Sequence, residues 1–415
     1  DCNGDCFGEA LLDECGVCGG GGLCEQTITI EITQGWNWFS LNVEDEDMSL
    51  GNIMSSLTPT SNDFIKSQTS SSTYYDGFGW YGGLEEFGVT GMYKFSSASP
   101  DALIYSGSPV NPSDHPLDLA TGWNWIGFTP QNDGPIGLAL ESVLTNANDF
   151  IKNQSASSTY YDGFGWYGAL ENMAPTEGYM LDVAQSSTLI YPNFGADDAL
   201  VRVQLDKELP IAISNWSVNH HNYEFSGHIT ISIENKEDSE GDYVAAFVGD
   251  ECRGIAERMY FPFGDSYVYN LMVYSNELDG EEITFKYYNS VDGTIAKYAE
   301  ALEFISDMII ADAFDTYGLS REENMTQLAT YSISGAYPNP FNPVTSFEYT
   351  TPEDGMVQIS VYDVNGRVVA ELVNEYVVAG SYPVVWNAND LSSGVYMVNM
   401  TAGNYTTMQK VMLIK

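Results

Sequence analysis

Residues 62–86 read NDFIKSQTSSSTYYDGFGWYGGLEE, and residues 148–172 repeat them as NDFIKNQSASSTYYDGFGWYGALEN. At this offset of 86 residues, 20 of the 25 aligned positions are identical. Two flanking segments repeat with them: GWNW begins at Gly35 and Gly122, and LIY begins at Leu103 and Leu189. A period of about 86 residues indicates a duplicated small domain rather than the short unit of a solenoid.

The repeated stretch predicts a β-hairpin, because an Asp-Gly pair between aromatic residues is typical of a two-residue type I′ loop. In the first copy this loop is at 76–77, so that Tyr75 pairs with Phe78 and Thr73 pairs with Trp80. We expect the face with Tyr75, Phe78 and Trp80 to be core, because each ring covers about 150–250 Å² that is costly to leave in water.

The opposite face of the hairpin predicts a shallow slot in which Gly79 separates two tyrosines. Sugar rings stack on such aromatic platforms, so we consider glycan binding by this face. The residues concerned are Tyr74 and Tyr81 in the first copy and Tyr160 and Tyr167 in the second. The alternative is that these tyrosines pack against the GWNW strand or against a neighbouring repeat.

Each repeat is expected to be an α+β module in which strands dominate. Alternation with a period of two puts Trp36 and Trp38 on one face of the opening strand and Phe39 on the other. A short helix follows, with Asp47 or Ser49 as its N-cap.

The charge composition argues against two classes of partner. The chain has 58 Asp plus Glu against 14 Lys plus Arg, which gives a formal net charge of −44. Nucleic acid and anionic membrane surfaces both require clustered cations, so neither is an expected partner. No apolar run approaches the roughly 20 residues of a membrane span. The acidity fits an extracellular, high-salt or calcium-containing setting.

The first 24 residues, DCNGDCFGEALLDECGVCGGGGLC, hold five of the six cysteines. Such clustering is typical of a disulfide framework outside the cytosol. Because the chain starts inside this motif, we expect a longer precursor.

The stretch resembles the Cys- and Asp-rich repeats of large bacterial surface proteins, distantly like thrombospondin type 3 repeats. That resemblance implies bound calcium and disulfides. The proposed oxygen ligands are Asp1, Asn3, Asp5 and Asp13, and the candidate disulfide cysteines are Cys2, Cys6, Cys15, Cys18 and Cys24. The spacing of Cys15 and Cys18 also matches a zinc knuckle, which is the alternative.

Residues 199–318 read as a β-sandwich, with short alternating strands around 201–205, 229–233 and 283–287. Cys252 is expected to be a buried free thiol. A metal site at His220, His221 and His228 is disfavoured, because sequential histidines point apart in a strand. The acidic run from Glu237 to Asp242 could hold a cation, although a solvated turn is commoner.

The last 80 residues predict a compact Ig-like sandwich with six strands and an Asn-Gly turn at 365–366. The blocks AYPNPFNPVTSFEYTTPEDG, ISVYDVNGRVVAELV, AGSYPVVWNA and LSSGVYMVNMTAGNYTTMQKVMLIK follow in order between Ala336 and Lys415. This region is similar throughout to the C-terminal sorting domain of type IX secretion substrates. The resemblance implies recognition by the outer-membrane translocon, removal by a surface sortase and, in many substrates, attachment to lipopolysaccharide. By motif match the recognition residues are Gly366, Gly380, Gly394, Tyr396, Lys410 and Lys415.

The sequence therefore predicts a mainly β, multidomain protein on the outer surface of a Gram-negative bacterium or outside it. The expected divisions are 1–26 (Cys-rich), 27–110 and 111–198 (repeats), 199–318 (β-sandwich), 319–332 (linker) and 333–415 (sorting domain). No catalytic motif is evident, so we expect no enzyme but a structural or adhesive protein. The alternatives are a self-assembling subunit of an extracellular filament or surface layer, and the glycan-binding C-terminal part of a larger secreted enzyme.

Overall fold

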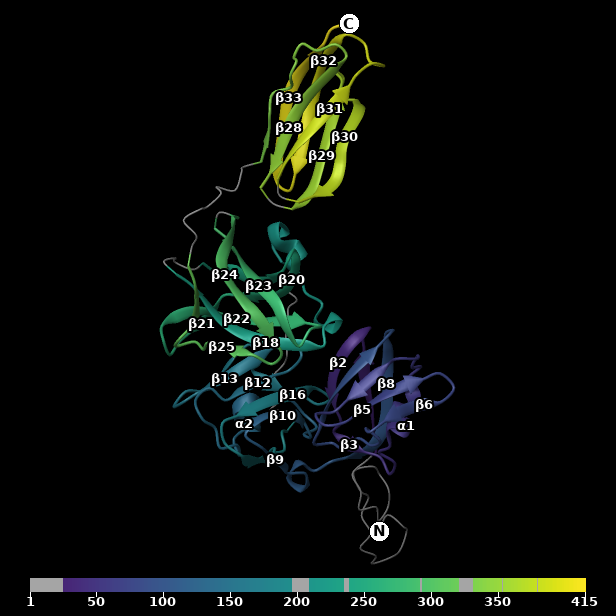
Figure 1. Ribbon diagram of the computed structural model, residues 1–415, viewed down its shortest axis with the longest axis vertical. Coiled ribbons are helices and arrows are strands. Elements are labelled where there is room, and N and C mark those ends of the chain that lie inside the picture. Colours follow the sequence, from purple (N-terminus) through teal and green to yellow (C-terminus); the bar gives the residue numbers. More distant parts are fainter. Residues whose placement is uncertain are drawn as a thin grey trace, which may run out of the picture.

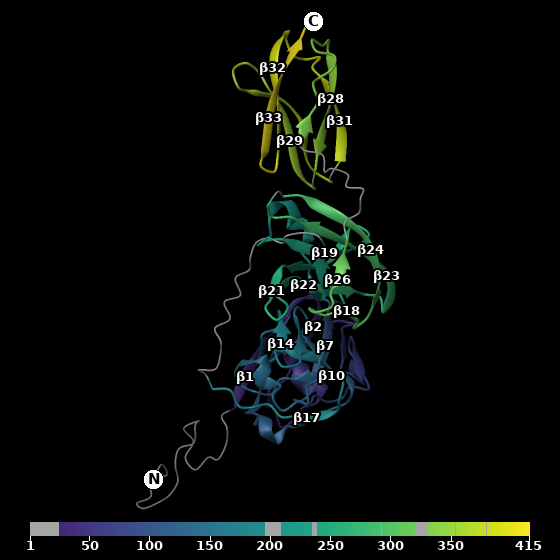
Figure 2. The same ribbon diagram turned by 90° about the vertical axis from the view of Figure 1, so that its left-hand side faces the viewer.

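A computed structural model describes residues 25–195, 209–234, 239–291, 293–320, 331–352, 354–378 and 380–415. Sheets account for nearly all of its regular structure, so the predicted mainly β, multidomain fold is confirmed. The two repeats lie side by side, a third unit sits on them, and the C-terminal unit lies at the far end (Figures 1 and 2).

The first repeat contains two sheets and one short helix. The three-stranded sheet is formed by β1 (Gln26–Ile32), β8 (Asp101–Pro109) and β3 (Val43–Glu44). The five-stranded sheet has the order β2 (Gly35–Ser40), β7 (Met92–Ser97), β4 (Phe64–Lys66), β5 (Ser71–Tyr75) and β6 (Gly79–Gly82). Helix α1 (Leu50–Ile53) continues into the 3₁₀ turn η1 (Met54–Ser56), and the side chain of its N-cap Ser49 accepts a hydrogen bond from the Asn52 amide.

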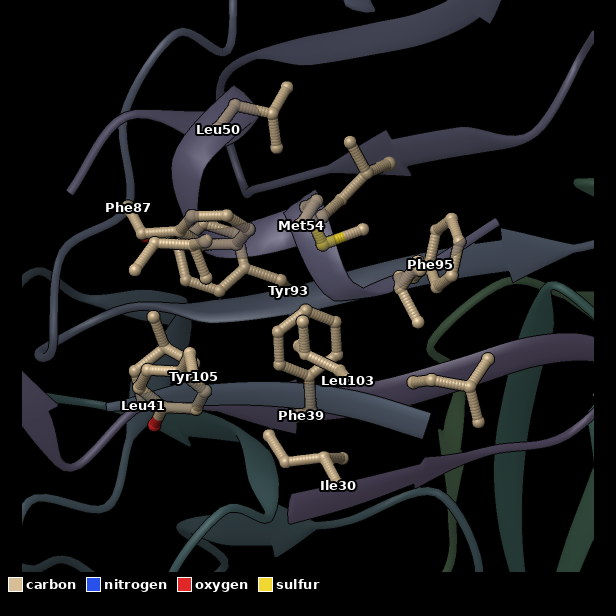
Figure 3. Close-up of a cluster of buried hydrophobic side chains, with 14 of the residues drawn as sticks. Ile30, Phe39, Leu41, Leu50, Met54, Phe87, Tyr93, Phe95, Leu103 and Tyr105 are labelled. Carbon is tan, nitrogen blue, oxygen red and sulfur yellow. The ribbon is translucent and has the colours of Figure 1, made fainter. Parts of the chain in front are cut away.

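The core of the first repeat lies between these two sheets and α1 (Figure 3). Phe39, Phe87 and Tyr93 pack ring against ring, with centroids 4.6–6.1 Å apart. Phe39 therefore points into the core, whereas Trp38, one residue earlier, points out of it towards the second repeat. The predicted division of this strand into two faces is confirmed.

The second repeat has the same five-stranded order. Its sheet consists of β10 (Gly122–Gly127), β16 (Gly178–Val183), β12 (Phe150–Lys152), β13 (Ser157–Tyr161) and β14 (Gly165–Gly168). Two small pairs accompany it, namely β11 (Gly134–Pro135) with β15 (Asn172–Met173), and β9 (Leu117–Leu119) with β17 (Ser187–Leu189). The helical segments are η2 (Pro112–Asp114) and α2 (Ile136–Ala139).

The third unit is a sandwich of two sheets. One sheet has the order β21 (Met259–Phe261), β22 (Ser266–Ser275), β18 (Phe225–Ile233) and β25 (Ile309–Ile310), with β26 (Tyr317–Leu319) also paired to β18. The other has the order β20 (Glu251–Glu257), β19 (Tyr243–Val248), β23 (Asp279–Tyr288) and β24 (Ile295–Ile305). Turns η3 (Ile211–Trp216) and η4 (His220–Asn222) precede β18. The strands predicted at 229–233 and 283–287 are confirmed, and the one at 201–205 lies outside the described residues.

The C-terminal unit is a second sandwich, and all six of its predicted strands are present. They are β28 (Val344–Thr351), β29 (Gly355–Tyr362), β30 (Val368–Val377), β31 (Gly380–Asn387), β32 (Gly394–Ala402) and β33 (Tyr405–Leu413). One sheet orders β27 (Ser332–Ile333), β28 and β31, and the other orders β30, β29, β32 and β33. The predicted turn at 365–366 is also present, since the Gly366 amide donates to the Asp363 carbonyl over 2.9 Å.

Candidate binding site

The hairpin β5–β6 has a three-residue loop, so the predicted two-residue turn is wrong. Tyr75 pairs with Gly79 and Tyr74 pairs with Trp80, which leaves residues 76–78 in the loop. Gly77 and Gly79 both have positive φ, at 78° and 83°. Three-residue hairpin loops need a residue with positive φ, which glycine adopts without steric cost. The second glycine of DGFG therefore allows a three-residue loop in place of the two-residue one. Phe78 is therefore at the tip of the hairpin, where it is 91 % exposed.

This change of register redistributes the aromatic side chains between the two faces of the hairpin, because a slip of one residue turns a strand over. Trp80 now shares a face with Tyr74, at a ring-centroid distance of 5.4 Å, and packs against the core residue Phe95. Tyr75 is 45 % exposed. The prediction of a core face is therefore correct for Trp80 and wrong for Tyr75 and Phe78.

The tyrosines predicted to share one slot lie on opposite faces of the hairpin. Tyr81 pairs with Thr73, so it shares the outer face of the sheet with Tyr75, whereas Tyr74 is on the inner face. The second copy has the same register, with Tyr160 opposite Trp166. Tyr160 is accordingly on the inner face and Tyr167 on the outer one. The two-tyrosine slot therefore does not form as predicted in either copy.

A groove of about 580 Å³ nevertheless brings Tyr74 and Tyr81 together at its wall. It runs between the inner face of the first hairpin and α1–η1. Its lining includes Leu50, Met54, Tyr74, Trp80, Tyr81 and Glu85. The volume is within the range of small-ligand sites, which are commonly apolar with a few polar groups. Tyr81 is 79 % exposed and forms part of the groove's rim.

The outer face and the tip of each hairpin together carry three aromatic residues, and the two copies differ in the surroundings of these residues. We call Tyr75, Phe78 and Tyr81 the first aromatic face. Tyr161, Phe164 and Tyr167 are the equivalent second aromatic face. Tyr161 is only 4 % exposed, and its hydroxyl accepts a hydrogen bond from the Ala313 amide over 2.9 Å.

The third unit covers the second aromatic face with phenylalanine rings. Phe261 lies 5.1 Å from Tyr161 and 5.4 Å from Tyr167 between ring centroids, and Phe263 lies 4.2 Å from Phe164. The Tyr167 hydroxyl donates to the carbonyl oxygen of Tyr260. Desolvation is the main cause that raises the pKa of both Tyr161 and Tyr167. The second aromatic face therefore forms part of the contact between the second repeat and the third unit.

The two repeats meet through an approximately symmetric junction. Gln154 donates to the Trp36 carbonyl over 2.7 Å and accepts from the Trp38 amide over 3.0 Å. Gln68 makes the equivalent bonds to Trp123 and Trp125, at 2.8 and 2.9 Å. Each glutamine thus binds the GWNW strand of the other repeat, and the duplicated segments hold the pair together.

The symmetry of this junction breaks at Lys94. Lys94 is 2 % exposed, with its Nζ 3.9 Å from the Trp38 ring centroid and 4.5 Å from that of Trp125. Desolvation holds the pKa of Lys94 well below its usual value. At the equivalent position the second repeat has Met180, which is fully buried in the same cluster.

Buried polar groups attach the third unit to the repeat pair. Lys152 Nζ contacts Asp307 Oδ1 at 2.7 Å and the Ser226 carbonyl at 2.9 Å, and the equivalent Lys66 pairs with Glu224. His228 Nδ1 is 3.0 Å from Ser157 Oγ. Burial and, secondarily, the charge of Lys152 lower the pKa of His228 to about 3. These bonds fix the third unit on the sheets of both repeats.

The other predicted site residues of the third unit, Cys252 and Asp242, are buried within its fold. Cys252 is free and buried, as predicted, and burial raises the pKa of its thiol to about 11. Asp242 is fully buried and accepts hydrogen bonds from the Ser239 and Ser290 amides. Among the residues that the structure describes, no group of three or more His, Cys, Asp or Glu is placed to hold a metal ion.

The expected calcium ligands Asp1, Asn3, Asp5 and Asp13 lie outside the described residues, as do Cys2, Cys6, Cys15, Cys18 and Cys24. Of the helices within the described ranges, none has the length and apolar character needed to cross a membrane.

The residues expected to carry sorting lie at turns and strand ends of the C-terminal unit. Gly366 occupies the turn between β29 and β30, and Gly380 and Gly394 begin β31 and β32. Tyr396 packs its ring 5.6 Å from Trp386 and donates to the Ser392 carbonyl over 2.7 Å. Lys410 is in β33, and its carbonyl accepts from the Asn339 side chain over 3.2 Å. The Lys415 side chain contacts the Asn389 carbonyl. Their role in sorting stays a prediction.

Several known structures show distant likenesses to this chain. A β-glucuronidase of Parabacteroides merdae is 9 % identical over 46 % of this chain and 25 % of its own, with a TM-score of 0.15. PorZ, a surface component of the type IX secretion system of Porphyromonas gingivalis, is 13 % identical over 88 % of this chain and 54 % of its own, with a TM-score of 0.17. The N-terminal eight Ig domains of Down Syndrome Cell Adhesion Molecule are 7 % identical over 93 % and 66 %, with a TM-score of 0.16. The chain thus spans a quarter of the first structure and about half of the second, and such scores support no functional inference.

The family comparison is specific to one unit. No curated protein matches the chain. Residues 335–415, in contrast, match the family described as the secretion system C-terminal sorting domain. These residues form the six-stranded sandwich described above. The sorting domain indicates that the chain is a type IX secretion substrate, delivered to the cell surface or the extracellular space.

Proposed function

We propose that this protein is a non-enzymatic adhesin of the bacterial surface, and that its first repeat binds glycans in the groove beside α1. The observation that carries the proposal is the groove itself, in which Tyr74, Trp80 and Tyr81 surround an open space of about 580 Å³. The sorting domain supports the location, because it accounts for display outside the cell.

The chemistry of the groove suits a neutral or weakly polar carbohydrate. Aromatic rings present flat apolar faces on which the C–H side of a sugar ring packs, and the tyrosine hydroxyls supply hydrogen bonds at the edge. Glu85 and Ser55 add acceptors to the lining. The net charge of −44 disfavours acidic glycans, since like charges repel.

The two repeats predict one glycan site rather than two. Tyr167, the counterpart of Tyr81, is engaged with Phe261 and with the Tyr260 carbonyl. A ligand that needed this tyrosine would have to displace the third unit. We therefore assign binding to Tyr74 and Tyr81, and leave Tyr160 and Tyr167 as the weaker candidates.

A glycan array with the full chain tests this proposal. Wild-type protein should bind a restricted set of neutral glycans, and Tyr74→Ala and Tyr81→Ala should each lose most of that signal. Tyr376→Ala is a matched control, because Tyr376 is an exposed tyrosine in β30, far along the chain from the groove. Absence of binding by the wild type would refute the proposed function.

Two further expectations belong to this proposal. Calcium bound by the N-terminal carboxylates should be detected by titration of the full chain, and a chelator should reverse it. Deleting residues 335–415 should leave the protein inside the cell envelope, measured by fractionation of the producing bacterium. Export of the truncated chain would contradict the role of its C-terminal unit.

A further inference from the structure

One nine-residue sequence, YYDGFGWYG, occurs at 74–82 and at 160–168 and has two different environments. In the second copy another unit buries Tyr161 and packs against Tyr167 and Phe164, of which Phe164 stays 52 % exposed. In the first copy the same three side chains are exposed: Tyr75, Phe78 and Tyr81. The register of the two hairpins is identical, so this difference does not arise from the hairpin.

The occupied copy shows what this surface binds. Its occupant is the edge of a β-sandwich, formed by the strand β21 with the turn that follows it to Phe263, together with Ala313 and Phe314 from the segment between β25 and β26. Phe261 and Phe263 fill the space between the hairpin's rings, with centroid distances between 4.2 and 5.8 Å. Main-chain groups form the hydrogen bonds of both tyrosine hydroxyls. The Tyr260 carbonyl accepts from Tyr167, and the Ala313 amide donates to Tyr161. The recognition therefore combines phenylalanine rings with main-chain polar groups.

A second copy of this chain is a poor occupant of the first aromatic face. The matching surface of such a copy is already used, since its Phe261 is completely buried under its own hairpin. Contact between two first hairpins would instead bring together their acidic groups, Asp76, Glu85 and Glu86. The described hairpin residues 71–86 carry no lysine or arginine to offset them.

We propose that the first aromatic face docks a β-sandwich domain of a different protein, through a phenylalanine-bearing strand edge of the kind that covers the second aromatic face. The partner presents two phenylalanine rings, a main-chain carbonyl for the Tyr81 hydroxyl and a main-chain amide for that of Tyr75. Its surface around this edge is neutral or basic, to complement the acidic hairpin. Tyr81 belongs both to this face and to the rim of the groove, whereas Tyr75 and Phe78 do not line the groove. Substitutions at Tyr75 and Phe78 therefore distinguish docking from glycan binding.

The size of the face limits the strength of the contact. Three aromatic side chains of about 150–250 Å² each, partly covered by their own repeat, leave less area than the roughly 800 Å² per partner of a stable interface. The contact by itself is therefore weak. It becomes effective when several copies on a cell surface engage together.

A peptide that copies the β21 part of the known occupant, with its two phenylalanines, tests this inference. The probe is a backbone-cyclised, fluorescently labelled peptide of residues 257–269, ERMYFPFGDSYVY, added to the full chain and followed by anisotropy. We expect saturable binding that weakens at least about tenfold in the Phe78→Ser/Tyr75→Ser variant. Phe78 is almost fully exposed, so this variant should keep the wild-type circular dichroism spectrum.

Two controls make the result specific. A peptide with Phe261→Ser and Phe263→Ser should not bind, and the Tyr74→Ala chain should bind the original peptide as the wild type does. Glycan binding should show the reverse pattern, with loss in Tyr74→Ala and retention in Phe78→Ser/Tyr75→Ser. The inference is overturned if the wild type fails to bind the peptide, if the serine peptide binds equally, or if the chain self-associates through Phe78 in light scattering.

Discussion

Replacing Tyr161 by alanine removes a ring that the second repeat buries against the third unit. Tyr161 and Tyr75 occupy the same position of two identical hairpins, but their exposed fractions are 4 % and 45 %. The pair of variants Tyr161→Ala and Tyr75→Ala therefore changes the same residue in the same local structure. Any difference in stability between them measures the contact with the third unit.

The expected magnitudes follow from the contacts. Replacing Tyr161 by alanine removes about 150 Å² of buried apolar surface, which lowers the free energy of unfolding by about 4 kcal/mol at 25 cal/mol per Å². It also leaves the buried Ala313 amide without its acceptor, which adds about 1 kcal/mol. Tyr75→Ala should cost about 1–2 kcal/mol, since half of its ring is already in water. The predicted difference is about 3 kcal/mol.

Hydrogen exchange read by mass spectrometry, during urea titration, resolves the effect by region. Peptides that cover 259–275 and 309–319 should lose protection at lower urea in Tyr161→Ala, while the first repeat is unchanged. Tyr161→Phe should show only the smaller loss of the hydroxyl contact. Equal effects of Tyr161→Ala and Tyr75→Ala would refute the asymmetric burial on which the docking inference rests.

Three further predictions concern single buried residues. The pKa of His228 is about 3 in the folded state and about 6.5 when unfolded, so the unfolded state takes up the proton first and stability falls as the pH drops below 6.5. We expect a loss of about 2 kcal/mol between pH 7 and pH 5, and a flatter profile for His228→Gln, in urea unfolding at each pH. Lys94→Met, which copies Met180 of the second repeat, should raise the urea midpoint, because burying the ammonium costs more than its ring contacts return; a lower midpoint would show that the cation–π contacts dominate. Tyr396→Ala should destabilise the C-terminal unit by about 3 kcal/mol and reduce the exported fraction, measured by calorimetry and fractionation; unchanged export despite unfolding would separate sorting from folding.

The sequence by itself determined the features that depend on local pattern. Alternation and turn residues predicted all six strands of the C-terminal unit, and the repeat predicted two modules with a common strand order. The hairpin was also predicted, but its register was not. Both a two-residue and a three-residue loop fit DGFG, since glycine tolerates positive φ at 77 and at 79. That choice decided whether Phe78 was core or exposed.

Only the tertiary structure decided what the duplicated hairpins contact. The segments 74–82 and 160–168 are identical, so no local property can distinguish them. The distinction arises because a single third unit rests on a nearly symmetric pair of repeats. It buries Tyr161 of the second aromatic face and leaves the equivalent Tyr75 of the first one 45 % exposed. This contact joins the second hairpin to residues more than 90 positions later in the sequence. It therefore arises from tertiary packing and not from local secondary-structure propensity.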